Sequence, residues 1–314
     1  MKSTASAPGK VILFGEHFVV HGTKAILCSI DKRVTVSSEI ISDKKIIVKS
    51  DLGQISVNSS EPISKIKSSF KPFIFIAKKM MEEFNHNAGI SIEINSEIPS
   101  GVGLGSSSAC CVAAAGSISA LFSKLSKEKI VQLSIDAEKT VFERASGADT
   151  TISAHGGIIE YDMGEFHPIK SKISFSLVIA NSTIIHSTSK VVTKVNEFRK
   201  KNNVEFSELC NQESKLIQKA QESIMNNDIV SLGKCMNENQ MYLEKIGVSN
   251  EKLQAMIAIA ERSSFGAKIT GAGGGGCIIA LVNDSNINET LQNLKQEKYE
   301  CFTTKIGVEG LNTF

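Results

Sequence analysis

The sequence lacks a strong excess of either charge, and it contains no long hydrophobic run. Its 35 Lys and Arg residues against 33 Asp and Glu residues give a formal net charge of +2. A protein that coats nucleic acid or an anionic membrane typically has a larger basic excess. No apolar run approaches the roughly 18 residues that a membrane-spanning helix needs. We therefore expect no nucleic-acid partner and no membrane association, and any anion site must be local.

The sequence also lacks a secretion signal and the cysteine spacing of a metal site or disulfide framework. Its first apolar run, Val11–Phe14, is short and stops at Gly15, unlike the hydrophobic region of a signal peptide. The seven cysteines are odd in number and scattered, and Cys110 and Cys111 are adjacent. Such usage is typical of reduced proteins inside cells. We therefore expect a cytoplasmic protein.

The composition is that of an ordinary globular protein. Hydrophobic residues make up 41% of the 314 positions and charged residues 22%, and this length predicts about two domains. Short alternating apolar runs predict strands in the first half, and polar-rich helical patterns dominate the second half. We place the boundary after residue 170, which gives domains 1–170 and 171–314 of mixed α+β structure. The basic run Arg199–Lys201 is interpreted as the solvated end of a helix.

The glycines cluster in two short stretches with different surroundings. The stretch 101–105 lies between the predicted strand 90–94 and the predicted helix 109–122. The stretch 271–276 lies between two apolar runs of strand length, 267–270 and 277–282. A further predicted helix covers 127–142, with Ile130, Leu133, Ala137 and Val141 along one face.

A glycine loop that opens a helix can bind phosphate, because its unobstructed N–H groups lie at the positive end of the helix dipole. The stretch 101–105, followed by three serines, has this context, and capping of the helix by the serines is the simpler alternative. No GxxxxGK[ST] string occurs, which disfavours a P-loop NTPase. The second stretch matches GxGxxG through Gly271, Gly273 and Gly276, but a strand follows it where the Rossmann motif needs a helix.

Three segments resemble the signature motifs of the GHMP small-molecule kinases. They are Ala7–His17, Pro99–Ser108 and Lys268–Cys277, in the order of that family and spread over the whole chain. Within it, Gly15–Gly22 and Ser146–Asp149 are similar to the mevalonate kinase family. The resemblance implies a ribosomal-S5-like N-terminal domain and a ferredoxin-like C-terminal domain. Phe14 and Ala145 depart from the residues that relatives often have at these positions.

The resemblance implies ATP-dependent phosphorylation of the 5-hydroxyl of (R)-mevalonate to 5-phosphomevalonate, a step of isoprenoid biosynthesis, with Mg²⁺ as cofactor. Asp149 then matches the catalytic base, and Lys10 stabilises charge on the transferred phosphoryl group. Ser107 and Glu138 match the Mg²⁺ ligands, in keeping with the preference of Mg²⁺ for oxygen. Without the resemblance, Asp149 would be interpreted as a turn residue, Glu138 as a solvated helix residue and Lys10 as a surface lysine.

The same resemblance implies the residues that bind the two substrates. ATP is expected to contact Pro99, Ser100, Gly101, Val102, Gly103, Leu104, Gly105, Ser106, Ser107, Ser108 and Ala109. Mevalonate is expected to contact Glu16, His17, Thr188, Gly271, Ala272 and Gly273. The expected partners are these small molecules, with a homodimer as an assembly that the resemblance allows.

Two alternatives remain open at this point. One is another GHMP kinase, such as a phosphomevalonate or galactose kinase. A phosphorylated substrate would require additional Lys or Arg side chains, which the pair Glu16 and His17 does not supply. The other is a non-catalytic module that uses an S5-like fold to bind nucleic acid, which the nearly neutral charge disfavours.

Overall fold

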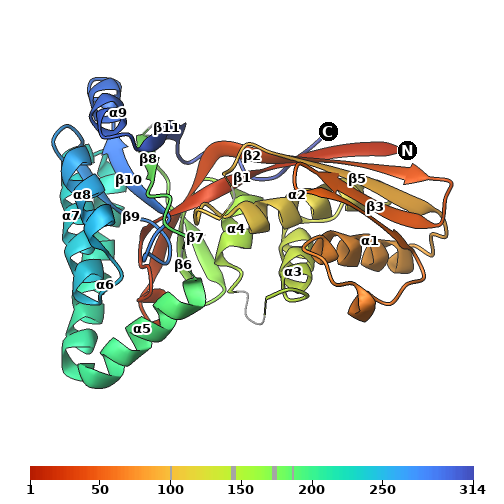
Figure 1. The fold of residues 1–314 in the computed structure, drawn as a ribbon, viewed down its shortest axis with the longest axis horizontal. Coiled ribbons are helices and arrows are strands. Elements are labelled where there is room, and N and C mark those ends of the chain that lie inside the picture. The colour runs from red at the N-terminus through yellow and green to blue at the C-terminus, as the bar shows by residue number, and fades with distance from the viewer. Residues whose placement is uncertain (100, 143–145, 172–174, 186) are drawn as a thin grey trace.

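The computed structural model describes residues 1–99, 101–142, 146–171, 175–185 and 187–314. The molecule is elongated, and its two sheets lie one after the other along the long axis (Figure 1). Helices cover the lower face of the first sheet in this view, and a second group of helices covers the other sheet at the opposite end. None of the helices found in these ranges is long and apolar enough to cross a membrane.

The first sheet contains the N-terminal strands and receives the C-terminal end of the chain. Its main path follows the order β12 (Asn312–Thr313), β1 (Lys2–Phe14), β2 (Ala25–Ile41), β5 (Gly89–Ser96), β3 (Lys45–Ser50) and β4 (Gly53–Asn58). β6 (Ile158–Asp162) pairs with β2 and with β7 (Glu165–Pro168). The helices on this sheet are α1 (Lys71–Glu83), α2 (Ser106–Ala120), α3 (Lys127–Glu138) and α4 (Ala148–His155), and short 3₁₀ turns occur at Val19–His21 and Ile63–Lys65.

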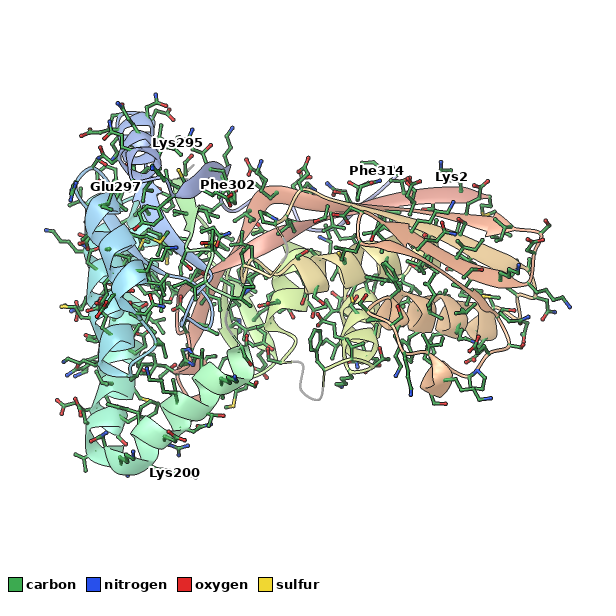
Figure 2. The ribbon with its side chains drawn as sticks, viewed as in Figure 1. Lys2, Lys200, Lys295, Glu297, Phe302 and Phe314 are labelled. Atoms are coloured by element: carbon green, nitrogen blue, oxygen red, sulfur yellow. The ribbon has the colours of Figure 1, made fainter. Side chains whose placement is uncertain are left out.

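The second sheet has the order β11 (Glu300–Lys305), β8 (Ser176–Asn181), β10 (Cys277–Val282) and β9 (Gly266–Ile269). β10 is buried along its whole length, as expected for an unbroken apolar run in a central strand. The accompanying helices are α5 (Thr188–Lys201), α6 (Asn203–Asn226), α7 (Ile229–Lys245), α8 (Glu251–Ala260) and α9 (Ile287–Gln296). Lys200 lies at the outer end of α5 (Figure 2), so the basic run is a solvated helix end, as predicted.

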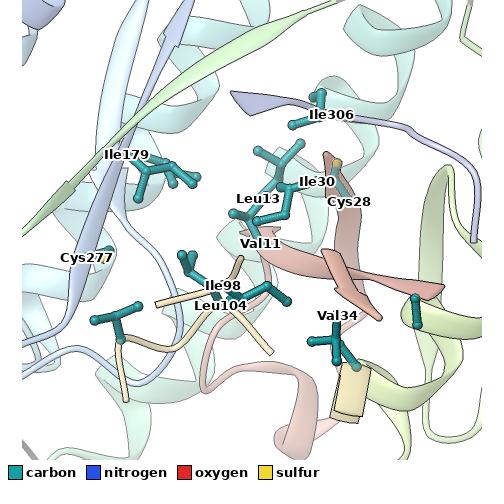
Figure 3. Packing of buried hydrophobic residues seen from close by; sticks show 14 of the residues in the cluster. Val11, Leu13, Cys28, Ile30, Val34, Ile98, Leu104, Ile179, Cys277 and Ile306 are labelled. Carbon is teal, nitrogen blue, oxygen red and sulfur yellow. The ribbon is translucent and has the colours of Figure 1, made fainter. Parts of the chain in front are cut away.

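One hydrophobic cluster joins the two halves of the molecule. It includes Leu13 of β1, Leu104 of the first glycine loop and Ile179 of β8, and Figure 3 shows these side chains around the junction. α2 packs in the middle of the first half, between β1, β2 and the neighbouring helices. It is built largely from small and apolar residues, so that it can be buried on nearly all sides.

Several predicted elements differ from the structure. The helix expected over 127–142 ends at Glu138, and Val141 is 42% exposed, because the chain turns after Glu138 and Thr140 Oγ1 donates to the carbonyl of Ala137 at 2.6 Å. Asp149, expected in a loop, lies in the first turn of α4. The sequence reasoning did not find α4, α9, β7, β11 or β12.

Candidate active site

The first glycine loop places the start of α2 at the junction of the two halves. Gly101, Gly103 and Gly105 all have positive φ angles, of 74°, 85° and 74°, which L-residues with side chains rarely adopt. Gly105 is the N-cap of α2, and the Leu104 carbonyl accepts a hydrogen bond of 2.9 Å from the backbone N–H of Lys10. The loop is thereby fixed against β1, and the first N–H groups of α2 are available to an anion.

A pocket of about 690 Å³ opens beside this loop. It is lined from both halves of the molecule by Lys10, Ile12, Gly15, Glu16, His17, Val19, Val20, Ala25, Leu27, Gly103, Gly105, Ser146, Ala148, Asp149, Tyr161, Met163, Thr188, Val192, Gly271 and Ala272. Among these side chains Lys10 is the one Lys or Arg. The pocket therefore combines an apolar wall with a small number of charged groups, as small-molecule sites do.

The residues expected to perform chemistry form an ion pair in this pocket. Lys10 Nζ lies 3.1 Å from Asp149 Oδ2. The lysine side chain is only 4% exposed, whereas the aspartate is 37% exposed. Lys10 leaves β1 beside the glycine loop, and Asp149 leaves the first turn of α4. A carboxylate that is held by a buried cation and still open to the pocket can accept a proton from a bound molecule.

Glu138, the last residue of α3, is buried behind this pair. Ser108 Oγ donates to Glu138 Oε1 at 2.7 Å, and Thr150 Oγ1 donates to Glu138 Oε2 at 3.1 Å. Burial raises the pKa of Glu138, and the negative charge of Asp149 raises it further, against the opposing effect of the serine and threonine hydrogen bonds. Ser107 is exposed at the start of α2. Within the described ranges no group of three or more His, Cys, Asp or Glu side chains is placed to hold a metal ion.

His17 lies on the opposite side of the pocket in a left-handed conformation, with φ of 62°. Its Nε2 lies 2.7 Å from the carbonyl of Ala272, so this nitrogen must be the donor. Burial lowers the pKa of His17, and the ring is therefore neutral at pH 7. The contact joins the first motif to the second glycine loop across 255 positions of sequence.

A buried ion pair, which the sequence reasoning missed, lies behind this side of the pocket. Lys268 of β9 pairs with Glu16, and both side chains have 0% exposure. Lys268 also donates to the carbonyl of Ile269 at 2.7 Å, while Glu16 Oε2 has no hydrogen-bond partner among the described residues. A signal was present, because Lys268, the first residue of the third motif, places a charge within a short buried strand next to Ala267 and Ile269.

Thr270 and Tyr161 were also missed. Thr270 Oγ1 accepts from the N–H of Ile12 at 3.0 Å and donates to its carbonyl at 3.1 Å, which joins the segment after β9 to β1. Tyr161 lines the pocket, and its hydroxyl donates to the carbonyl of Ser146 at 2.6 Å. This bond holds the segment before α4 in place.

Some expected contact residues lie away from the pocket. Gly273 packs against the loop after α7, and a Cβ at this position would approach the Val248 carbonyl to 2.5 Å. The side chains of Val102, Leu104 and Ala109 belong to the hydrophobic cluster, so only their backbones can meet a nucleotide. Ser100 lies outside the described residues.

Comparison with known proteins agrees with the motifs. A family model for the GHMP kinases N terminal domain matches residues 71–157, and one for the GHMP kinases C terminal matches residues 220–301. The mevalonate kinase of Pyrococcus furiosus is 36% identical to this chain, over 99% of this chain and 98% of that protein. The chain belongs to the mevalonate kinases of the GHMP kinase family. The two-domain α+β architecture that the motifs implied is thus confirmed.

Solved mevalonate kinase structures match over nearly the whole molecule. The Methanococcus jannaschii mevalonate kinase has a TM-score of 0.87 and 31% identity, covering 96% of this chain and 98% of that one. The L. major mevalonate kinase in complex with R-mevalonate has a TM-score of 0.81 and 25% identity, covering 97% of this chain and 96% of that one. As a member of these kinases, the chain is an enzyme that uses ATP as phosphoryl donor.

Proposed function

We propose that this chain transfers the γ-phosphoryl group of ATP to the 5-hydroxyl of (R)-mevalonate, giving 5-phosphomevalonate and ADP in isoprenoid biosynthesis. The observation that supports it most directly is the Lys10–Asp149 ion pair of 3.1 Å. This pair lies in one pocket with Gly103 and Gly105 of the glycine loop on one side and Glu16 and His17 on the other.

In this proposal the nucleotide phosphates lie at the glycine loop and the N-terminus of α2, within the stretch Pro99–Ala109. The positive-φ glycines leave the backbone N–H groups unobstructed, and the helix dipole favours negative charge there. A Cβ at Gly105 would approach Lys10 Cγ to 2.7 Å. The absence of a side chain at this position therefore lets the Lys10 side chain lie directly against the phosphate loop.

Ser107 and Glu138 fit the Mg²⁺ ion that we propose as cofactor. Both offer oxygen, the ligand atom that Mg²⁺ prefers, and Mg²⁺ is commonly held by one or two protein oxygens together with substrate phosphates and water. Glu138 and Asp149 place two carboxyl groups close enough for the charge of Asp149 to raise the pKa of Glu138, a local excess of negative charge that suits a cation. When bound, Mg²⁺ neutralises part of the phosphate charge.

Asp149 and Lys10 would have different roles in the phosphoryl transfer. The substrate hydroxyl gives its proton to Asp149 as its oxygen bonds to the γ-phosphorus, and the bond between that phosphorus and the ADP oxygen breaks. Lys10 faces the transferred oxygens, where its charge stabilises the transition state. Because Lys10 is almost fully buried, water screens this charge poorly and its effect is large.

The mevalonate end of the pocket is proposed to consist of Glu16, His17, Thr188 and the loop Gly271–Gly273. The apolar wall suits the methyl and methylene groups of mevalonate. Among the residues of the lining that the structure describes, Lys10 is the one Lys or Arg side chain. This favours mevalonate over a substrate that already has a phosphate group, which would need further cations.

A coupled ADP-release assay with a panel of small alcohols tests the proposed function. We expect turnover with (R)-mevalonate, a 5-phosphomevalonate product by mass spectrometry, and little turnover with galactose or 5-phosphomevalonate as acceptor. Robust turnover with one of the other acceptors and none with mevalonate would contradict the assignment.

Three smaller proposals accompany this function. The domains are proposed to divide at 170/171, between β7 of the first sheet and β8 of the second. A cytoplasmic location is supported by the seven cysteines, all of which are free thiols. A homodimer stays a prediction that light scattering of the purified protein would test.

A further inference from the structure

A second carboxylate, Glu213 of α6, is buried beneath the substrate side of the pocket. Its exposure is 0%. Glu213 Oε1 accepts a hydrogen bond of 2.9 Å from the backbone N–H of Gly15, and Oε2 accepts one of 2.7 Å from Asn239 Nδ2 of α7. Gly15 has a φ of 94° and begins the turn that presents Glu16 and His17 to the pocket. The carboxylate thus fixes the backbone from which two proposed substrate contacts extend.

Asn239 can serve Glu213 in both of its protonation states. Its side chain is fully buried, and its Oδ1 atom has no hydrogen-bond partner among the described residues. The amide donates Nδ2–H to an ionised Glu213. After a flip of the amide, Oδ1 would accept from a protonated Glu213. The hydrogen bond from Gly15 is available in either state, because one carboxyl oxygen stays an acceptor.

Among the residues that the structure describes, four titratable groups interact electrostatically with Glu213. Glu16 and Lys268 form the buried ion pair on one side, Tyr242 lies on α7, and Cys210 precedes Glu213 by one turn of α6. Burial raises the pKa of Glu213 to about 7, and the negative charge of Glu16 contributes to this increase. Glu213 therefore changes charge in the range in which a cytoplasmic enzyme works.

Given the proposed function, we propose that Glu213 is a positioning residue of the substrate pocket: it holds the Gly15 turn in both protonation states, and its charge weakens the binding of an anionic substrate. When Glu213 is protonated, Glu16 and Lys268 neutralise each other. When it is ionised, the same buried group has a net charge of −1. Mevalonate is an anion, so its dissociation constant rises as the pH increases through the titration of Glu213.

The test compares Glu213→Gln with the unmodified enzyme. The amide keeps an acceptor for Gly15 and can pair with a flipped Asn239, but it cannot ionise. Isothermal titration calorimetry would measure mevalonate binding at pH 6.0 and 8.0 without ATP. At an effective dielectric constant of about 20, one unit charge about 10 Å away changes affinity by roughly 16-fold when ionisation is complete. Titration between pH 6.0 and 8.0 is incomplete, so the change over this interval is roughly three- to tenfold. We expect this loss of affinity in the unmodified enzyme and a change below twofold in E213Q.

Two controls separate the charge of Glu213 from other effects. Glu160→Gln removes another buried carboxylate, which pairs with Lys24 outside the pocket lining, and it should keep the pH dependence of the unmodified enzyme. The KM for ATP should change equally with pH in all three proteins. Equal pH dependence in E213Q and the unmodified enzyme, or none in either, would overturn the inference.

Thermal unfolding gives a second readout that needs no substrate. Between the ordinary carboxyl pKa of 4.5 and about 7, the folded protein keeps the Glu213 proton while the unfolded chain releases it. Raising the pH through this window therefore favours unfolding. The Tm of the unmodified protein should fall by about 5 °C relative to E213Q between pH 4.5 and 8, and parallel Tm curves would contradict the titration.

A further variant keeps the inference testable if E213Q does not fold. Asn239→Leu removes the hydrogen bond from Asn239 in both protonation states, and the bond lost to the ionised carboxylate is the stronger one because it is charge-assisted. The inflection in mevalonate affinity should therefore move to higher pH, and an unmoved inflection would overturn the inference. Failure of the proposed function has a different signature. In that case the unmodified enzyme neither binds nor phosphorylates mevalonate at any pH.

Discussion

The active-site region contains two ion pairs with opposite surroundings. Lys10 and Asp149 meet where the aspartate is still 37% exposed to the pocket. Glu16 and Lys268 meet where neither side chain is exposed at all. Both pairs join segments far apart in the sequence, and both include a residue of the first motif.

The difference in exposure implies different roles for the two ion pairs. A carboxylate that is open to the pocket can exchange a proton with a substrate, whereas Glu16, which lines the pocket but is held by the buried Lys268, acts by fixing the shape and charge of the pocket wall. Each residue of the enclosed pair also depends more strongly on the other, because an isolated buried charge is strongly disfavoured. We therefore expect changes in the Lys10–Asp149 pair to affect turnover and changes in the Glu16–Lys268 pair to affect stability.

Asp149→Asn should produce the largest effect on turnover. The amide cannot accept the hydroxyl proton and no longer balances the charge of Lys10, so kcat should fall about 10³-fold. Unfolding by heat should change less than in a variant of the fully enclosed pair, because the amide oxygen can still accept a hydrogen bond from Lys10 and the aspartate end of the pair is 37% exposed. Steady-state kinetics and a melting curve check this. Asp136→Asn, in an exposed surface pair with Lys139, is the matched control, and a kcat of D149N within tenfold of normal would refute the assignment of the base.

Lys268→Met should produce the largest loss of stability. It leaves Glu16 buried without a counter-charge, which costs about 3–5 kcal/mol of unfolding free energy. Urea denaturation at pH 7 measures this change. The double variant with Glu16→Gln should regain much of the loss, because it contains no unpaired charge. Lys24→Met, in a pair whose lysine is 49% exposed, should cost no more than about 1 kcal/mol, and equal losses in K268M and K24M would remove the proposed contrast.

Gly105→Ala should have the smallest effect, since it displaces Lys10 without removing its charge. Gly101 and Gly105 share a φ of 74°, so an alanine strains both positions alike. Only at Gly105 does the new Cβ meet Lys10, while the space beside Gly101 is open. Both variants should raise the KM for ATP, and G105A should also lower kcat by about tenfold, as one misplaced charge contact would. Equal kcat values in the two variants would show that the position of Lys10 does not affect phosphoryl transfer.

Elements with a strong local pattern were predicted well. The strand over 277–282 has the predicted bounds, and the helix predicted over 109–122 begins three residues earlier, at Ser106. Of the elements that were missed, α4 and β12 have weak patterns of their own, whereas α9 was missed although its pattern is clearly amphipathic. α4 is only eight residues long, and β12 is a two-residue strand that forms by pairing with β1 at the other end of the chain.

Part of the pocket lining was predictable from the resemblance to the family, since Lys10, Asp149, Glu16, His17 and Thr188 all line the pocket, whereas Tyr161 and most of the apolar lining were not predicted. The buried residues behind the pocket that hold its lining in place were not predicted, although the sequence contains a signal for Glu213. It occupies a position on the buried stripe of α6 beside Leu209, Leu216 and Ile217. A carboxylate at such a position needs a partner, but periodicity cannot say which one.

By itself, the sequence determined the first glycine loop, the helix that follows it and the identities of the groups that meet there. These depend on neighbouring residues, because glycine conformations and helix starts are local properties of the chain. Only the tertiary structure decided that Lys268 neutralises Glu16 and that Glu213 holds Gly15. These partners are 252 and 198 positions apart, and they meet because the second sheet and its helices pack behind the first motif.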